Sequence, residues 1–378
     1  MRLGSLSDQF GPFDGRVWLN AAHQGPLPRP AQAAVTVAAE MKANPHRLAD
    51  EAFWAVPDRL RLTLARFIDA EPSEIALTNS TSYGINVVAE GLALDEGDEV
   101  LVVKGDFPAT VLPWLAKPGV QVRFLDGTNG AIDPDRLEAE LGPRTRVFCS
   151  SWVFSFFGYA IDLAALGAVC RRHGVVFVVN GSQGVGARPL SVKEIPIDAL
   201  AACGFKWLCG PYATGFCWLA AHLLDRVGHP VPNWLLAQRA AGLNREMGYD
   251  LPSEASAARF DVFCTANFLN FMPWTASVDH LLSFGIEAIH AHDQALIDQL
   301  VERLPPDYDL VSPRQGSERS TLALLTHRQA ERNQAVAARL ADAGIDVAMR
   351  EDKIRIAPHL YNSAADIDAV LDVLTEVA

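Results

Sequence analysis

The 378-residue sequence lacks the features of membrane-spanning, secreted and zinc-binding proteins. It has no apolar run long enough to span a bilayer, and its N-terminal segment has no apolar signal core. Its six cysteines include no Cys-x-x-Cys pair and lie mostly in apolar stretches, which is typical of buried free thiols in a reducing compartment. We therefore expect a cytoplasmic protein without a disulfide framework or a bound metal.

Positive charge is also scarce. The chain carries 32 Lys and Arg against 45 Asp and Glu, a net charge of -13. This balance argues against nucleic acid or an anionic membrane as the main partner, although it permits a small basic pocket for a phosphate or carboxylate. Hydrophobic residues make up 49% and charged residues 20%, which is typical of a well-packed globular enzyme.

Apolar strands alternate with helical stretches over the first two thirds of the chain. Strands are expected at 99–103, 120–124, 146–151 and 175–179. Such near-continuous apolar strands are buried on both faces, as in a parallel sheet. A helix is expected from Asp162, as N-cap, to His173, with Gly174 as its stop. The pattern predicts an α/β protein with a mainly parallel central sheet between helices.

The pattern changes after about residue 265. The elements expected there are a long helix over 273–303, a strand at 322–326, a helix at 328–343, strands at 346–350 and 353–357, and a helix at 363–377. Helices on a short sheet make a smaller α+β domain. We place the large domain at 15–265 and the small domain at 266–378 together with 1–14, with Pro252 and Pro273 as possible markers of the boundary.

Lys206 is a lone lysine among small and apolar residues, in the run 201–211. Burying its charge would be costly, and burial would lower its pKa and make the amine a nucleophile. The ordinary alternative is a lysine that reaches out from a strand end into water. Other segments of the chain favour the reactive lysine.

The segment 77–86 is a strand end followed by three hydroxyl residues and a helix. Ser80, Thr81 and Ser82 could bind an anion together with the N–H groups at the start of that helix, although simple N-capping is the alternative.

Four further residues follow or lie within expected strands. Asn180 and Gln183 could face polar atoms of a ring, although a turn rich in Asn and Gly is the alternative. Phe107 could stack on a planar cofactor or belong to the core. Arg355 could grip a substrate carboxylate with two hydrogen bonds, or lie exposed on its strand.

In this order, the segments resemble the class V aminotransferase family of pyridoxal-phosphate enzymes, of fold type I, which includes kynureninase, isopenicillin N epimerase and cysteine desulfurase. The resemblance covers nearly the whole chain, from 18–28, which looks like the family's N-terminal active-site loop, to 358–362. Its most specific part is the motif around Lys206 followed by 210–216. It implies a large cofactor-binding domain and a smaller α+β C-terminal domain.

The resemblance implies a role for each matching residue. Lys206 would form the Schiff base with pyridoxal 5′-phosphate and shuttle the Cα proton. Phe107 would stack on the pyridine ring, and Gln183 would contact the phenolic oxygen. Arg355 would bind the substrate carboxylate, and His23 is a candidate for the wall of the substrate pocket.

The resemblance also assigns the phosphate. Ser80, Thr81 and Ser82 would hold it, with Ser82 the strongest candidate. Cys203 stands where a serine commonly helps to hold it. Thr265 matches a threonine that usually reaches the phosphate from the partner subunit, which implies a homodimer with shared active sites.

Position 180 departs from the family pattern, because Asn180 stands where the family normally has aspartate. The aspartate keeps the pyridine nitrogen protonated, and the protonated ring is the electron sink for a Cα carbanion. Asparagine can accept a hydrogen bond from a protonated nitrogen or donate one to a neutral nitrogen. We expect carbanion chemistry to be weakened. An engineered substitution, a reaction that needs a weaker sink and a loss of catalysis all stay open.

The preferred interpretation is a pyridoxal-phosphate enzyme of the class V aminotransferase type that acts on an amino acid or amine through Lys206. Epimerisation and C–S or β-elimination are the alternatives on the same fold, and a non-catalytic binding protein is the rival from another class. No cysteine follows residue 264, although desulfurases carry their catalytic cysteine on a loop of the C-terminal domain, so the sequence argues against desulfurase activity.

Overall fold

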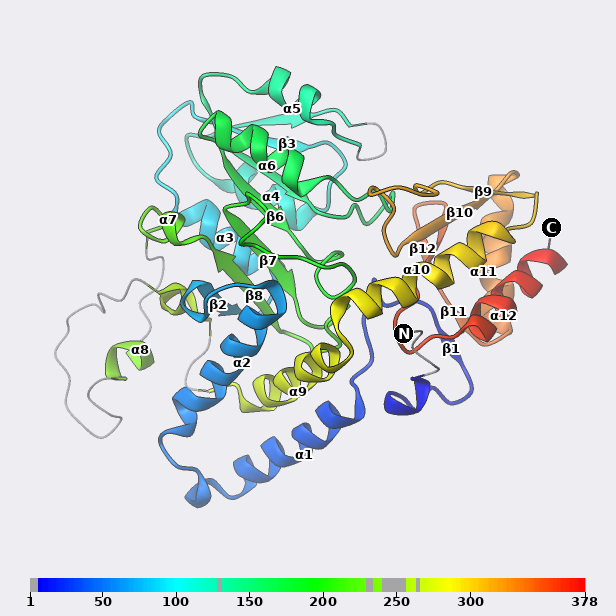
Figure 1. The fold of residues 1–378 in the computed structure, drawn as a ribbon, viewed down its shortest axis with the longest axis horizontal. Coiled ribbons are helices and arrows are strands. Elements are labelled where there is room, and N and C mark those ends of the chain that lie inside the picture. Colours follow the sequence, from blue (N-terminus) through cyan, green and yellow to red (C-terminus); the bar gives the residue numbers. More distant parts are fainter. Residues whose placement is uncertain (1–5, 128–130, 229–233, 240–255, 263–265, 378) are drawn as a thin grey trace.

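The computed structural model describes residues 6–127, 131–228, 234–239, 256–262 and 266–377. A seven-stranded sheet with the order β2-β8-β7-β6-β5-β3-β4 forms its centre (Figure 1). Only β8 runs antiparallel to its neighbours, so the expected mainly parallel sheet is confirmed. The strands are β2 Ile75–Thr78, β3 Glu99–Val103, β4 Gln121–Leu125, β5 Thr145–Ser151, β6 Val176–Asn180, β7 Ala199–Cys203 and β8 Gly215–Leu219.

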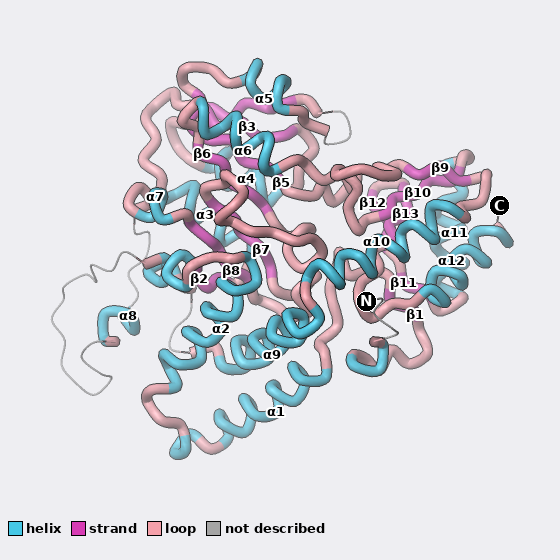
Figure 2. Tube along the Cα trace, viewed as in Figure 1, coloured by secondary structure: helices cyan, strands magenta, loops and turns pink. Residues whose placement is uncertain are grey.

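Helices cover both faces of this sheet (Figure 2). One face packs against α2 (Ala52–Ile68), α6 (Leu163–Arg172) and α9 (Phe268–Phe284). The other packs against α3 (Thr81–Gly91) and α4 (Pro108–Ala116). Neighbouring strand residues point to opposite faces, and both faces are buried at the inner strands, which explains their continuous apolar runs. The expectation of burial on both faces is wrong for β4, because it is an edge strand and only Leu125 in it is buried.

The C-terminal third forms a second, smaller layer around the four-stranded sheet β12-β13-β10-β9. Its strands are β9 Tyr308–Leu310, β10 Ala323–His327, β12 Ala348–Arg350 and β13 Lys353–Ile356, and its helices are α10 Ile286–Glu302, α11 Asn333–Asp342 and α12 Ala364–Glu376. The remaining elements include α1 Arg29–Ala43, α5 Pro134–Glu140, α7 Ala221–Leu224, α8 Trp234–Gln238, β1 Val17–Trp18 and β11 Ile345–Asp346.

Several expectations for single elements are confirmed and others are wrong. Asp162 caps α6 by accepting from the Ala165 N–H at 3.0 Å, as expected. The single helix expected over 273–303 is two helices, because Gly285 has φ +83° and ends α9 before α10 begins. Pro273 lies inside α9, so it marks no boundary, and Pro252 lies outside the described residues.

Two further corrections concern the C-terminal layer. The helix expected over 328–343 begins at Asn333, whose side chain accepts from the His327 N–H and so ends β10 before the helix starts. The strand expected over 346–350 is split, because β11 pairs with β1 whereas β12 pairs with β13.

The division into two domains stays a prediction, and two sets of contacts cross it. The helix α9, placed in the small domain, packs against α1 and α2 (Figure 1). The strand β1, placed in the large domain, pairs with β11 in parallel. Within the part of the chain that the structure describes, no helix is both long enough and apolar enough to cross a membrane.

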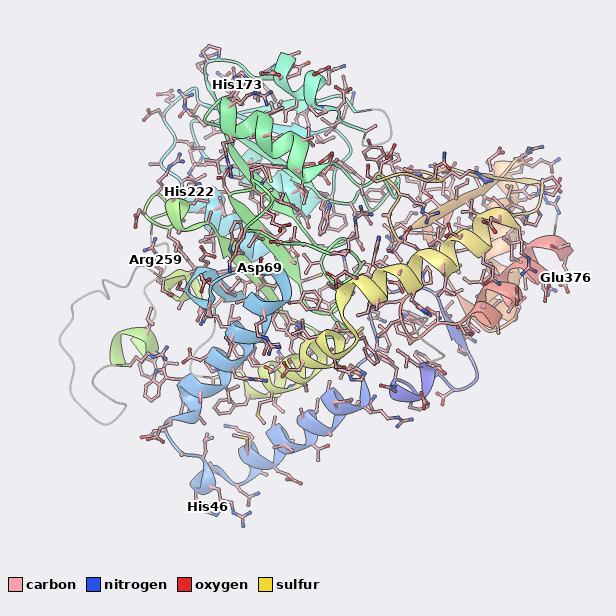
Figure 3. All side chains as sticks on the ribbon, viewed as in Figure 1. His46, Asp69, His173, His222, Arg259 and Glu376 are labelled. Carbon is pink, nitrogen blue, oxygen red and sulfur yellow. The ribbon has the colours of Figure 1, made fainter. Side chains whose placement is uncertain are left out.

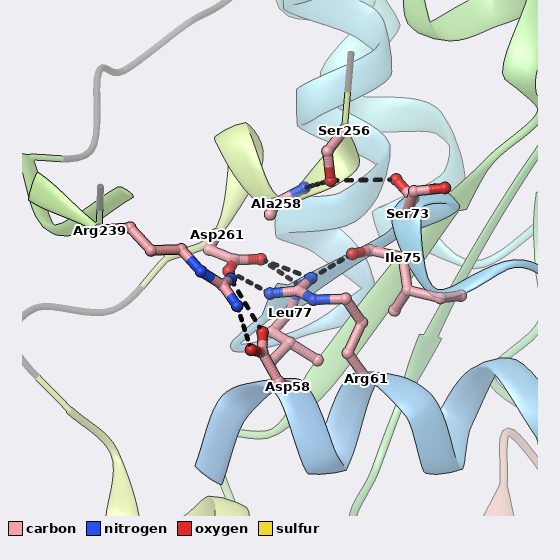
Figure 4. Close-up of polar contacts among 9 residues, drawn as sticks. All are labelled: Asp58, Arg61, Ser73, Ile75, Leu77, Arg239, Ser256, Ala258 and Asp261. Atoms are coloured by element: carbon pink, nitrogen blue, oxygen red, sulfur yellow. Dashed lines mark hydrogen bonds and ion pairs between the residues drawn. The ribbon is translucent and has the colours of Figure 1, made fainter. Parts of the chain in front are cut away.

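Most ion pairs lie at the surface in contact with solvent, whereas one ion pair near the large sheet is buried. Asp69, His173 and Glu376 lie on the outer surface in exposed pairs (Figure 3). By contrast, Arg61 of α2 binds Asp261 at 2.6 Å, with both side chains more than 90% buried. Asp261 also accepts from the Leu77 N–H at 2.7 Å (Figure 4). This pair fixes β2, the strand that leads into the hydroxyl segment.

Candidate active site

The predicted site residues gather at one edge of the large sheet. Lys206 follows β7 and Asn180 ends β6, while Phe107 follows β3. The hydroxyl segment 80–82 follows β2. The strands β2, β3, β6 and β7 point in one direction, because β8 is antiparallel to both β2 and β7. Their carboxyl ends therefore meet, as in other α/β proteins with a ligand site at that edge.

Lys206 has the environment of a reactive amine. Burial lowers its pKa, Cys203 opposes that change, and Arg355 and Arg350 lower the pKa further. The Lys206 Nζ atom lies 5.7 Å from the centroid of the Phe107 ring. Phe107 keeps 41% of its surface exposed, so its face is accessible to a planar group. The amine is thus deprotonated at a lower pH than an ordinary lysine.

Backbone contacts hold the Lys206 loop in place. Gly25 donates to the Phe205 carbonyl at 2.9 Å, and a Cβ at Gly25 would collide with the Lys206 carbonyl. His359 contacts the Trp207 carbonyl through Nε2 at 3.0 Å. The loop that carries the lysine is therefore fixed by the N-terminal segment 18–28 and by a residue of the C-terminal layer.

Gln183 also connects these segments. Its Nε2 donates to the Ala22 carbonyl at 3.0 Å, and its Oε1 accepts from the Trp207 Nε1 at 2.8 Å. One N–H of the side chain remains for a ligand. The contact to a phenolic oxygen stays a prediction, and the structure adds a role in positioning the Lys206 loop.

The three hydroxyl residues, 80–82, differ in whether their side chains are free to bind a ligand. Ser80 caps α3 by accepting from the Tyr83 N–H at 3.1 Å, and it donates to Asn79. Thr81 contacts Ser182 at 2.7 Å through its hydroxyl. Ser82 is exposed, and its hydroxyl has no partner among the described residues. The roles in phosphate binding stay predictions, with Ser82 the freest of the three.

Asn180 is buried in a polar network. Its Nδ2 donates to the Thr110 Oγ1 at 2.9 Å. Its Oδ1 accepts from both the backbone N–H of Ser182 at 3.1 Å and the Ser182 hydroxyl at 2.6 Å. Sequence reasoning missed Thr110 and Ser182, and only the position of Ser182 two residues after Asn180 could have indicated it.

Arg355 points inward and is fully buried, so the alternative of an exposed strand residue is wrong. Its Nη1 donates to the Ser155 hydroxyl at 2.8 Å, and its Nη2 reaches the Asn20 Oδ1 at 3.5 Å. Its Nε has no partner, and no carboxylate of the described residues pairs with it. Burial and Arg350 lower its pKa to about 9. A buried guanidinium without a counter-ion fits an anionic ligand.

The other predicted residues lie as follows. His23 is exposed, and partial burial together with Arg350, Arg355 and Lys206 lowers its pKa. Cys203 is buried at the end of β7. Thr265 lies outside the described residues. Sequence reasoning missed Arg350, which shares a sheet face with Arg355 because the pairs Arg350–Lys353 and Ala348–Arg355 lie in register.

Solved structures of fold type I enzymes share this architecture. The complex of the cystine C–S lyase C-DES with its reaction product cysteine persulfide has a TM-score of 0.87, with 23% identity over 97% of this chain and 99% of that chain. A C-DES mutant with glycine covalently linked to its PLP cofactor has a TM-score of 0.88, with 22% identity over 98% of each chain. The predicted fold is confirmed.

The model of the family described as "Aminotransferase class-V" matches residues 27–370. A probable cysteine desulfurase of Methanothermobacter thermautotrophicus is 31% identical over 75% of this chain and 71% of its own length. The isopenicillin N epimerase of Streptomyces clavuligerus is 27% identical over 94% of this chain and 93% of its own length. The chain belongs to the class V aminotransferase family, and the predicted family and its cofactor, pyridoxal 5′-phosphate, are confirmed.

The residues present fit this cofactor. Lys206 supplies an amine of lowered pKa and Phe107 an accessible ring face 5.7 Å away. The N–H groups of Thr81 and Ser82, at the start of α3, have no acceptor among the described residues. A helix N-terminus with free N–H groups suits a phosphate.

Proposed function

We propose that the chain is a pyridoxal-phosphate-dependent enzyme that removes the Cα proton of an amino acid. The observation that carries this proposal is a lysine of lowered pKa near a buried arginine that has no counter-ion among the described residues. Lys206 would hold the cofactor through its Nζ atom and would move the Cα proton of the substrate. The bound cofactor supplies the electron sink.

The other residues bind and orient. Arg355 binds the substrate carboxylate through its Nη groups and its unpaired Nε. Phe107 stacks on the ring, and Gln183 donates its remaining N–H to the phenolic oxygen. Ser82 and the first N–H groups of α3 hold the phosphate.

The proposal also covers the oligomeric state, the cellular location and the remaining contacts of the phosphate. The enzyme is a cytoplasmic homodimer, and the partner subunit supplies its Thr265 to the phosphate. Cys203, buried at the end of β7, would take the place of the serine that commonly helps to hold the phosphate.

For the reaction, we propose β-elimination at a substrate with a leaving group on Cβ. The desulfurase relatives support a substrate with a C–S bond. The five described cysteines, at 149, 170, 203, 209 and 217, are all buried and free, so none of them could accept sulfur at the surface. Cys264 lies outside the described residues, and without an acceptor thiol among those described, cleavage of the C–S bond would end in elimination.

Epimerisation is the second candidate. It needs a second base besides Lys206, and His23 could be that base. Partial burial, together with the charges of Arg350, Arg355 and Lys206, lowers the pKa of His23, which favours the neutral imidazole that a base requires. The full-length similarity to isopenicillin N epimerase supports this alternative.

The test of the proposal is covalent trapping. The purified protein with pyridoxal 5′-phosphate is reduced with borohydride and digested, and the modified peptide is sequenced. We expect the label on Lys206, and none in Lys206→Ala. A protein that takes up no cofactor, or takes it up on another lysine, would overturn the proposal.

The products distinguish the reactions. With cysteine, elimination releases pyruvate, ammonia and sulfide, whereas desulfuration releases alanine. Epimerisation yields the D-amino acid, and transamination proceeds only with an added keto acid. Release of pyruvate without an added keto acid supports elimination, and release of alanine contradicts it.

A further inference from the structure

A line of four buried polar side chains runs from the end of β6 to the end of β3. The Asn180 Nδ2 contacts the Thr110 Oγ1 at 2.9 Å, which contacts the Ser151 Oγ at 3.2 Å, which contacts the Asp106 Oδ1 at 2.5 Å. None of the four is more than 9% exposed. The protons in such a line have a definite order, because each hydroxyl has one proton to donate.

Asp106 sets that order. Its carboxylate accepts from the Phe107 N–H at 2.6 Å, the Ser151 N–H at 2.8 Å and the Ser151 hydroxyl. Burial raises the pKa of Asp106 to about 6 against the effect of these donors, so the group is ionised at pH 8. Ser151 therefore donates to Asp106, Thr110 donates to Ser151, and Thr110 can only accept from Asn180.

Ser182 fixes the other end of Asn180. Its backbone N–H is only a donor, so the Asn180 atom 3.1 Å from it must be the oxygen Oδ1. The Ser182 hydroxyl also donates to Oδ1, at 2.6 Å, so both acceptor positions of that oxygen are occupied. The Nδ2 group has two N–H bonds and one goes to Thr110. A single N–H donor is all that Asn180 has left for a ligand.

We propose that Asn180 gives this N–H to the ring nitrogen of pyridoxal phosphate and thereby keeps that nitrogen unprotonated. The inference rests on the proposed function, because it requires the cofactor at this site. A protonated ring nitrogen would place an N–H against an N–H and leave both donors unsatisfied in a buried place. Asp106 does not replace the missing carboxylate, because three donors already share its charge and two side chains separate it from Asn180.

The same network shows that position 180 is built for an amide. A carboxylate there would face Thr110, whose proton goes to Ser151. Thr110 would have to turn its proton toward that carboxylate and lose the contact to Ser151. Asparagine is therefore consistent with its surroundings, and the weaker electron sink is a property of this enzyme.

The experiment measures the ring nitrogen directly. Pyridoxal phosphate labelled with ¹⁵N in the ring is loaded onto the protein at pH 8, visible absorbance verifies binding, and the ¹⁵N chemical shift is recorded. We expect the shift of a neutral pyridine in the natural protein and that of a pyridinium in Asn180→Asp. A pyridinium shift in the natural protein with bound cofactor would overturn this inference alone. A protein that binds no cofactor would overturn the proposed function as well.

A second measurement needs no cofactor. The melting temperatures of the apo-protein and of apo Asn180→Asp are compared, with Gln334→Glu at an exposed position of α11 as the matched change of amide to carboxylate. We expect a lower melting temperature only for Asn180→Asp. A higher melting temperature for that variant would show a network built for aspartate and would contradict the inference. If Asn180→Asp fails to fold, the ¹⁵N shift of the natural protein still decides.

Discussion

At the scale of single residues, the lowered pKa of Lys206 comes from its surroundings. Burial is the main cause of its lowered pKa, and the guanidinium groups of Arg355 and Arg350 add to it. A lysine attacks an aldehyde as the neutral amine, so each nearby positive charge extends reactivity to lower pH.

The first prediction concerns Arg350. Arg350→Ala removes a positive charge near Lys206 while Arg355 stays in place, so the pKa of Lys206 should rise. The pH profile of the rate of covalent trapping by pyridoxal phosphate should shift to higher pH. Arg303→Ala, at an exposed pair with Asp368, serves as the control and should leave the profile unchanged. A shift to lower pH would contradict the assignment.

The second prediction concerns Arg355. Arg355→Gln should reduce kcat/KM for the amino acid by roughly 10- to 100-fold, because a charge-assisted hydrogen bond is worth about 1.5–3 kcal/mol and 1.4 kcal/mol corresponds to tenfold. The loss should appear mainly in KM, measured by steady-state kinetics. Ser155→Ala removes the Arg355 partner at 2.8 Å and should have a smaller effect. Equal KM values in Arg355→Gln and the natural protein would exclude this carboxylate site.

At the scale of elements, a buried ion pair joins the C-terminal layer to the Lys206 loop. The His359 Nδ1 contacts the Asp293 Oδ2 of α10 at 2.9 Å, and both side chains are fully buried. The other ring nitrogen donates to the Trp207 carbonyl next to Lys206. With both nitrogens donating, the ring is an imidazolium that fixes the loop from the side of α10.

The third prediction is that Asp293→Ala lowers the free energy of unfolding by about 3–5 kcal/mol, because it leaves a buried charge without a partner. Asp368→Ala breaks the exposed pair with Arg303 and should cost less than about 1 kcal/mol. Urea denaturation of both variants measures the difference. Similar losses in the two would show that the buried pair has no special role.

The fourth prediction gives the pH dependence of this pair. Burial alone would lower the pKa of His359, but Asp293 overcomes it and raises the pKa to about 10. The folded pKa exceeds the unfolded value, so the stabilisation is complete below about pH 6.5 and is lost as pH rises through about 10. Between pH 6 and pH 10 the natural protein should lose more stability than His359→Gln. Parallel losses would contradict an imidazolium at this position.

At the scale of the whole molecule, the described residues leave apolar surface uncovered near the start of α9. Leu269 is 49% exposed and Phe268 lies beside it. Both line a groove of about 540 Å³ together with Met41 of α1 and Phe53 of α2. An apolar groove of this kind is typical of a protein interface, which agrees with the dimer that the family resemblance predicts.

The fifth prediction is that Leu269→Glu shifts the protein from dimer to monomer in sedimentation equilibrium, because it places a charge in an apolar interface. Phe124→Glu is the control, because Phe124 is as exposed as Leu269 but lies on the edge strand β4, at the far end of the large sheet from β2. This variant should leave the dimer intact. A monomeric natural protein would also remove the shared active site that Thr265 implies.

The sequence by itself determined most of the local elements and singled out the candidate reactive groups. Apolar runs predicted β3, β4, β5 and β6 to within one residue. Of these, β3, β5 and β6 are buried on both faces as expected, whereas the edge strand β4 is largely exposed. The capping signals of α6 were sufficient, whereas Gly285 was not recognised as a break because helix-compatible residues continue on both sides of it.

Only the tertiary structure decided which hydrogen-bonding atoms of each side chain remain free for a ligand. Arg355 meets Ser155 and Asn20 from distant parts of the chain, and Gln183 meets Ala22 and Trp207. Burial and hydrogen-bond direction depend on such long-range partners, which no local spacing encodes. For the same reason, the sequence did not decide whether Asn180 accepts a hydrogen bond from the ring nitrogen or donates one to it. The packed network leaves only one N–H donor of its side chain.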